Sequence, residues 1–447
     1  MNKYLLSLLL LALLLQGCGG SSSDIPTEPV EPQEYTFLLT AQLTNNCGIK
    51  SAFTDVELLL QDDTWQTLNS YKPDENGVIS FVTDSEFINY TLVAKNQQGN
   101  EAQGLNVVSF FQANSATPSH YQAQFDESLD NTSCECVTQN IELSHRTFDA
   151  QTSVTSSLGD VSWTPIDSKT TLLEGIKVCK AIDGNWPLHS FTVSGTDINQ
   201  KSIVAGGFKD DFSENIDGVW LLTADEVADI VDLVMPHQAF TTSQIIDNSK
   251  HFYTDVIEED ESLSIFNAHM HVGRAYYQSQ ASITFEESSS IFGSSVIKTH
   301  QQIISTEAEE SFAVKASEKK PAIDDRNFSE IQADGRYDYS AVKGYPMAKI
   351  IFTFTTYEPT TKLLMPAKWT FYGPEKGLLA ISAPLTGYEE FIDINTDKKS
   401  TDVRLIKSMI TNNYQDYIKY YQSNDSTDMS NEFVKKLDEV EINIKLH

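Results

Sequence analysis

Runs in which apolar and polar residues alternate occupy most of the chain, and this alternation predicts β-strands. The first run, 35–45 (YTFLLTAQLTN), ends at the turn-forming sequence Asn45-Asn46-Cys47-Gly48. Three further runs follow, at 53–61, 77–83 and 88–96. Polar turns such as 74–77 (DENG) separate them. Short strands that recur every ~8–12 residues are typical of an all-β sandwich.

The alternating pattern continues beyond this first group of strands. It extends to about residue 144 and returns in a second β-rich stretch over 146–222. Two longer ribbons follow at 262–287 and 348–384. The stretch between them, 315–338, is polar, and it predicts a long loop.

Two segments have helical spacing instead. Thr223-Ala224-Asp225-Glu226 has the form of a capping box. The helix that it predicts has its apolar residues at Val227, Ile230, Val231 and Val234, and it ends at Pro236. Near the C-terminus, apolar and aromatic residues recur every three or four positions, at Val403, Ile406, Ile410, Tyr414, Tyr417 and Tyr421. That spacing predicts one face of an amphipathic helix of about five turns, packed against a sheet.

These patterns predict a mainly β protein with three folded parts. Residues 35–145 are predicted to form a β-sandwich module and 146–222 a second β-rich module. Residues 223–447 are predicted to form an α+β domain with an antiparallel sheet and the C-terminal amphipathic helix. A chain of 447 residues has room for that many domains at ~100–200 residues each.

The N-terminal segment indicates export. Lys3 precedes an unbroken apolar run from Leu5 to Leu15. That run is too short to span a bilayer, which takes ~20 residues. Residues 1–17 are therefore predicted to be a signal peptide.

The end of this segment, Leu15-Gln16-Gly17-Cys18, resembles the lipobox of bacterial lipoproteins. The resemblance implies cleavage before Cys18 and diacylation of its thiol, which gives a stable anchor. Gly19 stands where an aspartate would indicate inner-membrane retention, so we expect the outer membrane. Residues 18–34 are rich first in Gly and Ser and then in Pro and Glu, and they predict a flexible tether.

Within the first module, the segments TDVELLL, DENGVISF and INYTLVAKN resemble the carboxypeptidase regulatory-like module, a small transthyretin-type sandwich. The resemblance covers residues 35 to about 98. It implies a spacer or binding platform rather than an enzyme.

Four cysteines remain after Cys18: Cys47, Cys134, Cys136 and Cys179. An even number in an oxidising compartment predicts two disulfides. A bridge within Cys134-Glu135-Cys136 would close a very tight ring, so Cys47 is expected to pair with one half of this motif and Cys179 with the other. Both remaining pairings stay open, and either one links the first module to the second. A metal thiolate cluster is the alternative.

The charge of the chain limits its partners. Asp and Glu number 63 against 31 Lys and Arg, which gives a net charge of −32. Nucleic acid binding needs a basic face, so it is not expected. The acidity favours solubility.

His269 and His271 lie in the sequence NAHMHVG, which resembles the first metal-binding strand of the amidohydrolases. On a strand both rings would share one face with Asn267. A barrel enzyme of that family needs ~250 residues and further ligands on later strands. We therefore favour a solvent-facing polar row on an antiparallel ribbon. A metal site completed by His237, His251 or His300 is the alternative.

Other candidate sites are less specific. Asp393, Asn395 and Asp397 have calcium-loop spacing, but Lys398 and Arg404 occupy positions that such a loop reserves for glycine and glutamate. An Asx-rich turn with Ser400 or Thr401 capping a helix is the favoured interpretation. Trp186, Trp369 and Tyr372 could stack on sugar rings, although core packing is the favoured role for each.

The function that these features favour is a non-enzymatic lipoprotein of the cell envelope, acting as a binding or structural module without a cofactor. Its partners would be the outer membrane, through the lipid, and another envelope protein or a polysaccharide. One alternative is a metal-dependent hydrolase using His269 and His271. Another is a carbohydrate-binding surface protein. No G-x-S-x-G, H-E-x-x-H or phosphate-loop motif occurs.

Overall fold

The computed structural model describes most of the chain after residue 32. The described residues are 33–45, 47–96, 104–123, 133–213, 218–229, 238–246, 249–256, 262–266, 275–290, 293–323, 335–357, 364–392, 397–423 and 431–446. The protein is mainly β, with 62% strand and 7% helix in several sheets, so the mainly β class is confirmed. The predicted signal peptide and Cys18 lie outside the described residues.

A four-stranded sheet forms from the first alternating runs. Its strands are β1 (Tyr35–Thr44), β2 (Lys50–Ala52), β5 (Val78–Thr83) and β8 (Ser119–Ala123). β1 pairs antiparallel with β2 and β5 and parallel with β8. Phe37, Leu39 and Ala41 of β1 are buried on one face, which explains the alternation in the sequence.

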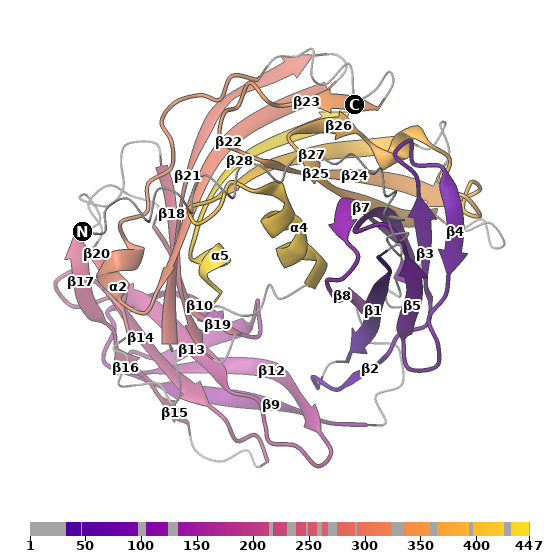
Figure 1. The fold of residues 1–447 in the computed structure, drawn as a ribbon. Coiled ribbons are helices and arrows are strands. Elements are labelled where there is room, and N and C mark those ends of the chain that lie inside the picture. Colours follow the sequence, from indigo (N-terminus) through magenta and orange to yellow (C-terminus); the bar gives the residue numbers. More distant parts are fainter. Residues whose placement is uncertain are drawn as a thin grey trace, which may run out of the picture. The chain divides into compact units, whose positions relative to one another are not determined.

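Twelve strands form one larger sheet, called the central sheet below (Figure 1). In spatial order they are β19 (Ser249–Val256), β18 (Gln238–Ile246), β21 (Ala275–Ser290), β22 (Gly293–Ser305), β28 (Lys436–Leu446), β27 (Asp397–Ser408), β24 (Met347–Tyr357), β25 (Leu364–Pro374), β7 (Gly104–Asn114), β6 (Phe87–Asn96), β3 (Val56–Gln61) and β4 (Thr67–Tyr71). All neighbours are antiparallel except β25 and β7. Strands from both ends of the chain thus share this sheet, and residues 35–447 form one compact unit.

Two further four-stranded sheets pack face to face. One contains β10 (Ala150–Ser156), β13 (His189–Thr196), β14 (Ser202–Lys209) and β16 (Leu222–Thr223). The other contains β11 (Ser162–Asp167), β12 (Thr170–Ala181), β9 (Cys134–Ser144) and β15 (Val219–Trp220). Between β15 and β16, the fully buried Leu221 joins the cluster that both sheets enclose. β9 pairs with β12 although it precedes residue 145, and the predicted domain boundaries stay predictions.

The described residues contain few helices. They are α2 (Ala308–Ser311), α4 (Tyr414–Ser423), α5 (Glu432–Lys435) and the 3₁₀ turn η3 (Ala380–Ser382). α4 and α5 lie against one face of the central sheet (Figure 1), where Tyr417 and Phe433 share a core with Met347 and Ile406. The expected packing of the aromatic stripe against a sheet is therefore confirmed. No helix among the described residues has the length and apolar character needed to cross a membrane.

The predicted C-terminal helix is wrong in its first half. Val403 and Ile406 lie on β27, and the helix begins only at Tyr414. β27 is buried on one face along the core that includes Val403, and near Ile406 a second core buries its other face as well. A strand buried on both faces loses its alternation, so its apolar residues imitate helical spacing. Ser400 and Thr401 accordingly pair with β24 and cap no helix.

The helix predicted after Thr223 is also wrong where the structure describes it. Residues Asp225–Asp229 form strand β17, which pairs with β20 (Ser262–Ile265). Pairing with a distant strand has overridden the local helical preference. In the predicted long loop, 315–323 has no regular structure, and β23 (Arg336–Asp338) pairs with β26 (Lys376–Leu378).

The two faces of the central sheet differ. One is covered along β24, β25, β27 and β28 by an apolar core that includes Phe352, Trp369 and Leu405. The other is apolar where α4 and α5 cover it, and also over β3, β6 and β7, where the sheet of β1, β5 and β8 packs on it. Between the helices and the far ends of β22, β28, β27, β24 and β25, this second face is polar.

Candidate functional site

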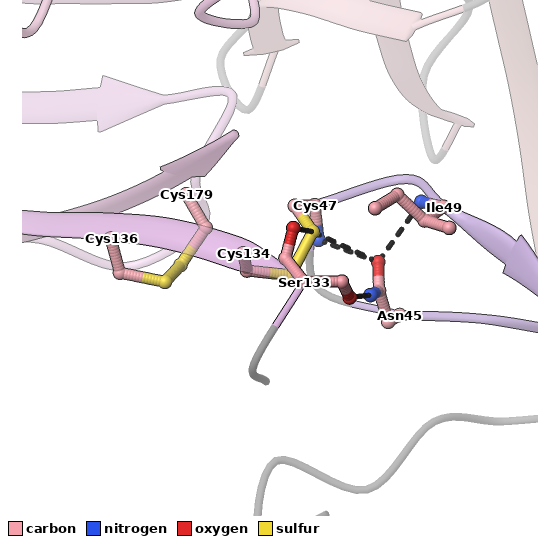
Figure 2. The surroundings of a disulfide bond; sticks show 7 residues. All are labelled: Asn45, Cys47, Ile49, Ser133, Cys134, Cys136 and Cys179. Carbon is pink, nitrogen blue, oxygen red and sulfur yellow. Dashed lines mark hydrogen bonds between the residues drawn. A yellow bond between two sulfur atoms is a disulfide. The ribbon is translucent and has the colours of Figure 1, made fainter. Parts of the chain in front are cut away.

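The first of two unusual features is the pair of disulfides on β9 (Figure 2). Cys136 and Cys179 lie directly opposite each other on β9 and β12, with their Cα atoms 4.1 Å apart. Cys134 is bonded to Cys47, across 87 residues of sequence. Two disulfides are therefore confirmed, and the pairing is one of the two that the sequence left open.

The Cys47–Cys134 disulfide fastens the start of β9 to the turn that follows β1. Asn45 organises this turn, because its side-chain oxygen accepts hydrogen bonds from the backbone N–H of Cys47 at 3.1 Å and of Ile49 at 2.9 Å. Its side-chain nitrogen donates to Ser133 Oγ at 3.1 Å (Figure 2). Covalent and hydrogen bonds thus hold the two segments together at the same place.

The second feature is the polar part of the central sheet, called the charged face below. It comprises five cations, Lys298, Lys349, Lys368, Arg404 and Lys445, and three acids, Asp402, Glu439 and Glu441. Strand register places these residues on one face, because Lys298 pairs with Glu441, Glu441 with Arg404, and Arg404 with Lys349. Lys445 on β28 and Lys368 on β25 belong to a second row of residues across the sheet. This row runs from Lys445 through Ser400 and Thr353 to Lys368, and it faces the same side.

Two acids of the charged face, Glu441 and Asp402, contact neighbouring side chains. Glu441 Oε2 lies 2.8 Å from His300 Nε2, and Glu441 Oε1 lies 3.7 Å from Arg404 Nη2. The hydrogen bond from His300 holds the pKa of Glu441 below its ordinary value. Asn443 Nδ2 donates to Asp402, whose pKa is raised by burial and then by the charge of Glu441.

Most of the cations lie near these acids without forming an ion pair with them. Among the residues that the structure describes, Lys298, Lys349, Lys368 and Lys445 form no ion pair. Arg404 contacts Glu441 with one terminal nitrogen, and its buried Nε lacks a hydrogen-bond partner. Five cations against three acids leave a local excess of two positive charges (5 − 3 = 2), although the whole chain carries −32.

Lys349 is the most enclosed of these cations. Its ammonium lies 5.4 Å from the ring centroid of Tyr372 and 5.9 Å from that of Tyr421 on α4. Burial, followed by the charge of Arg404, lowers its pKa. The two tyrosine rings stack on each other at 5.0 Å. Cation–π contact supplies part of the stabilisation that a carboxylate would otherwise give.

A hollow of about 510 Å³ adjoins these residues on β21, β22 and β28. Its lining includes Lys298, Lys445, Glu441 and Asn443, together with the hydroxyl groups of Thr284 and Ser294. Ammonium, amide, carboxylate and hydroxyl groups therefore surround one open space. Such a set can hold an anionic ligand by hydrogen bonds and charge.

The predicted histidine pair cannot be placed. His269, His271 and the alternative ligand His237 lie outside the described residues, so the polar row and the metal site both stay predictions. Of the other two candidates, His251 is buried with its Nδ1 3.0 Å from Ser190 Oγ, and His300 contacts Glu441. No group of three or more potential metal ligands occurs within the described ranges.

The candidate sugar-stacking aromatics are engaged in packing. Trp369 is 2% exposed, and its indole N–H donates to Ser109 Oγ at 2.9 Å. Tyr372 stacks on Phe110 and Tyr421. Trp186 is half-buried beside Phe212, with Lys180 above its ring. In the calcium-like segment, Asp393 and Asn395 lie outside the described residues, and Asp397 begins β27 rather than a helix.

Reasoning from the sequence did not identify the charged face. Lys298, Lys349 and Arg404 lie on three strands that are distant in sequence, and no local motif joins them. The one available signal was the lysine on the polar side of each strand in AKIIFTF and PAKWTFY, in a chain that is poor in basic residues.

Comparisons with known proteins assign no family. No family model and no curated protein matches the chain. Among solved structures, the chain is similar to two B repeat units (B1B2) of the collagen binding protein of Staphylococcus aureus, at 9% identity and a TM-score of 0.13. That match covers 76% of this chain and 100% of the other. So low a score carries no argument about fold or function.

Proposed function

We propose that this protein is a lipoprotein of the bacterial outer membrane that acts as a non-enzymatic binding or structural module. In this proposal the lipid on Cys18 anchors the chain, and the segment up to residue 34 is the tether. The folded part begins with a β-sandwich module of the carboxypeptidase regulatory-like type. The partner would be another envelope protein or a polysaccharide.

One observation carries the proposal: the disulfides account for every cysteine except Cys18. The sequence contains five cysteines, and four of them are bonded as Cys47–Cys134 and Cys136–Cys179. Disulfides are typical of exported proteins. The one remaining thiol is the cysteine of the lipobox-like sequence, where lipidation would use it.

A labelling experiment tests the anchor. The full-length chain would be produced in a Gram-negative host fed an alkyne analogue of palmitate, and the membranes would be separated on a density gradient. We expect labelled protein in the outer-membrane fraction. Cys18→Ser should abolish the label and leave an unprocessed or soluble chain, because it removes the acylated thiol.

The matched control is the double variant Cys136→Ser/Cys179→Ser, which loses two other cysteines and keeps Cys18. It should carry as much label as the wild type. The proposal is wrong if Cys18→Ser remains labelled in the outer membrane, or if the wild type carries no label.

A further inference from the structure

We propose that the charged face binds an acidic polysaccharide, with carboxylates of the sugar chain held by Lys298, Lys368, Arg404 and Lys445. This inference rests on the proposed function, since it gives the envelope module its ligand. It assigns binding to charged groups rather than to the aromatic residues that the sequence suggests for sugar binding, although Tyr372, one of those residues, lies beside Lys349.

The imbalance of charge is the first argument. Within the described part of the chain, the lysines of this face form no ion pair and are not outnumbered by local acids, although the chain has twice as many acids as bases. An excess of cations on one face, with four lysines that form no ion pair to the described residues, therefore favours an external anion as their partner.

The spacing of the charges points to an extended ligand. From Lys298 on β22 to Lys368 on β25 there are four strand intervals, which is roughly 19 Å at the usual separation of strands. A single carboxylate or phosphate can neutralise only one part of such a row. A linear chain with charges at intervals can contact all of it.

The groups between the cations favour a sugar over a polyphosphate. Asp402 and Glu441 can accept hydrogen bonds from hydroxyl groups, whereas they would repel closely spaced phosphates. Asn443, Thr284 and Ser294 line the adjoining hollow and can donate to or accept from hydroxyls. Lysine also binds as a point charge, without the paired geometry that arginine offers to phosphate.

Binding can be measured with polygalacturonate as the probe. The full-length protein, purified in a neutral detergent, would be titrated with fluorescent oligogalacturonate at low ionic strength. The triple variant Lys298→Gln/Lys368→Gln/Lys445→Gln should bind at least about tenfold more weakly, because three charge contacts are lost. Added salt should weaken wild-type binding, since these charges are accessible to solvent.

The matched control removes three exposed lysines from other surfaces, as Lys50→Gln/Lys177→Gln/Lys343→Gln. It changes net charge equally and should bind like the wild type. Equal losses in both triple variants would show a non-specific charge effect and overturn the proposal. So would the absence of wild-type binding, or equal binding of a neutral dextran.

Two further probes separate other anionic ligands. Inorganic polyphosphate and phosphatidylglycerol vesicles should bind more weakly than oligogalacturonate. If either binds more tightly, the saccharide assignment is wrong. The anchor is judged separately, because the lysine variants should remain lipidated at Cys18 whatever they bind, and Cys18→Ser should still bind the probe.

Discussion

Cys136 and Cys179 face each other directly across β9 and β12, so they form a cross-strand disulfide between two neighbouring strands. It closes a loop of 43 residues, from one strand to the other. Closing such a loop lowers the entropy of the unfolded chain. The disulfide beside it, Cys47–Cys134, ties the same strand to the first sheet.

Removing the Cys136–Cys179 disulfide should therefore destabilise the two sheets that contain β9 to β16. We expect Cys136→Ser/Cys179→Ser to lower the free energy of unfolding by about 2–4 kcal/mol. Urea titration under non-reducing conditions measures this change. An unchanged midpoint, with the wild type shown by mass mapping to hold the disulfide, would mean that strand pairing alone fixes β9 to β12.

A buried polar network should couple the N-terminal strands to the C-terminal ones. Thr91 on β6 contacts Ser109 on β7 at 2.7 Å, and Ser109 accepts the indole N–H of Trp369 on β25. Ser109→Ala would leave that buried N–H without its acceptor, at a cost of about 1–3 kcal/mol. Thermal unfolding followed by circular dichroism should show a lower Tm.

The control is Ser70→Ala, at an exposed position on β4, which should leave the Tm unchanged. The shift in Ser109→Ala should affect the unfolding of the whole central sheet, because the network crosses from β6 to β25. If only part of the transition moved, the N-terminal strands and the C-terminal ones would be separate folding units.

How much the sequence could predict depended on the range of the interactions involved. The turn at Asp74 was evident because Asp74 accepts hydrogen bonds from the backbone of Asn76 and Val78, and Gly77 adopts a φ of +77°. Such turns are encoded by adjacent residues. The parallel pairing of β25 with β7 joins residues about 260 positions apart, and no local pattern specifies it.

The same distinction applies to the candidate sites. Cysteine number and spacing limited the disulfides to two pairings, and geometry then selected one. The charged face needed the register of five strands before Lys298, Arg404 and Lys349 could be placed together. In β27 the sequence was misleading, because burial of both faces near Ile406 interrupts the alternation that identifies a strand.

His189 should make the protein less stable in mild acid. Burial, followed by the charge of His251, lowers the pKa of His189 to about 4. An unfolded histidine titrates near pH ~6.5, so the unfolded state binds the proton first. The stabilisation is complete above that pH and is lost as the pH falls from about 6.5 towards 4.

Urea midpoints of the wild type and of His189→Asn, measured from pH 7.5 to 4.5, test this expectation. The variant lacks the titrating group. The variant should lose less stability over that interval than the wild type does. His120→Asn, at an exposed position on β8, should follow the wild-type curve. Parallel curves for wild type and His189→Asn would show that other groups, such as the carboxylates, cause the acid sensitivity.

Lys349 allows stability to be separated from ligand binding at one position. Its ammonium is enclosed by Tyr372 and Tyr421 and forms no ion pair with a carboxylate of the described residues, and keeping such a charge half-buried is costly. In Lys349→Met an apolar side chain of similar length would fill the same space without that cost. The free energy of unfolding should therefore stay within about 1 kcal/mol of the wild type or rise, since the lost cation–π contact is of that size.

Binding of oligogalacturonate by Lys349→Met should weaken, because the positive potential of the charged face falls. A lysine retained for its cation–π contacts and not for binding would give the opposite result, with stability lost and affinity unchanged. Titrations of one protein preparation with urea and with the probe distinguish the two.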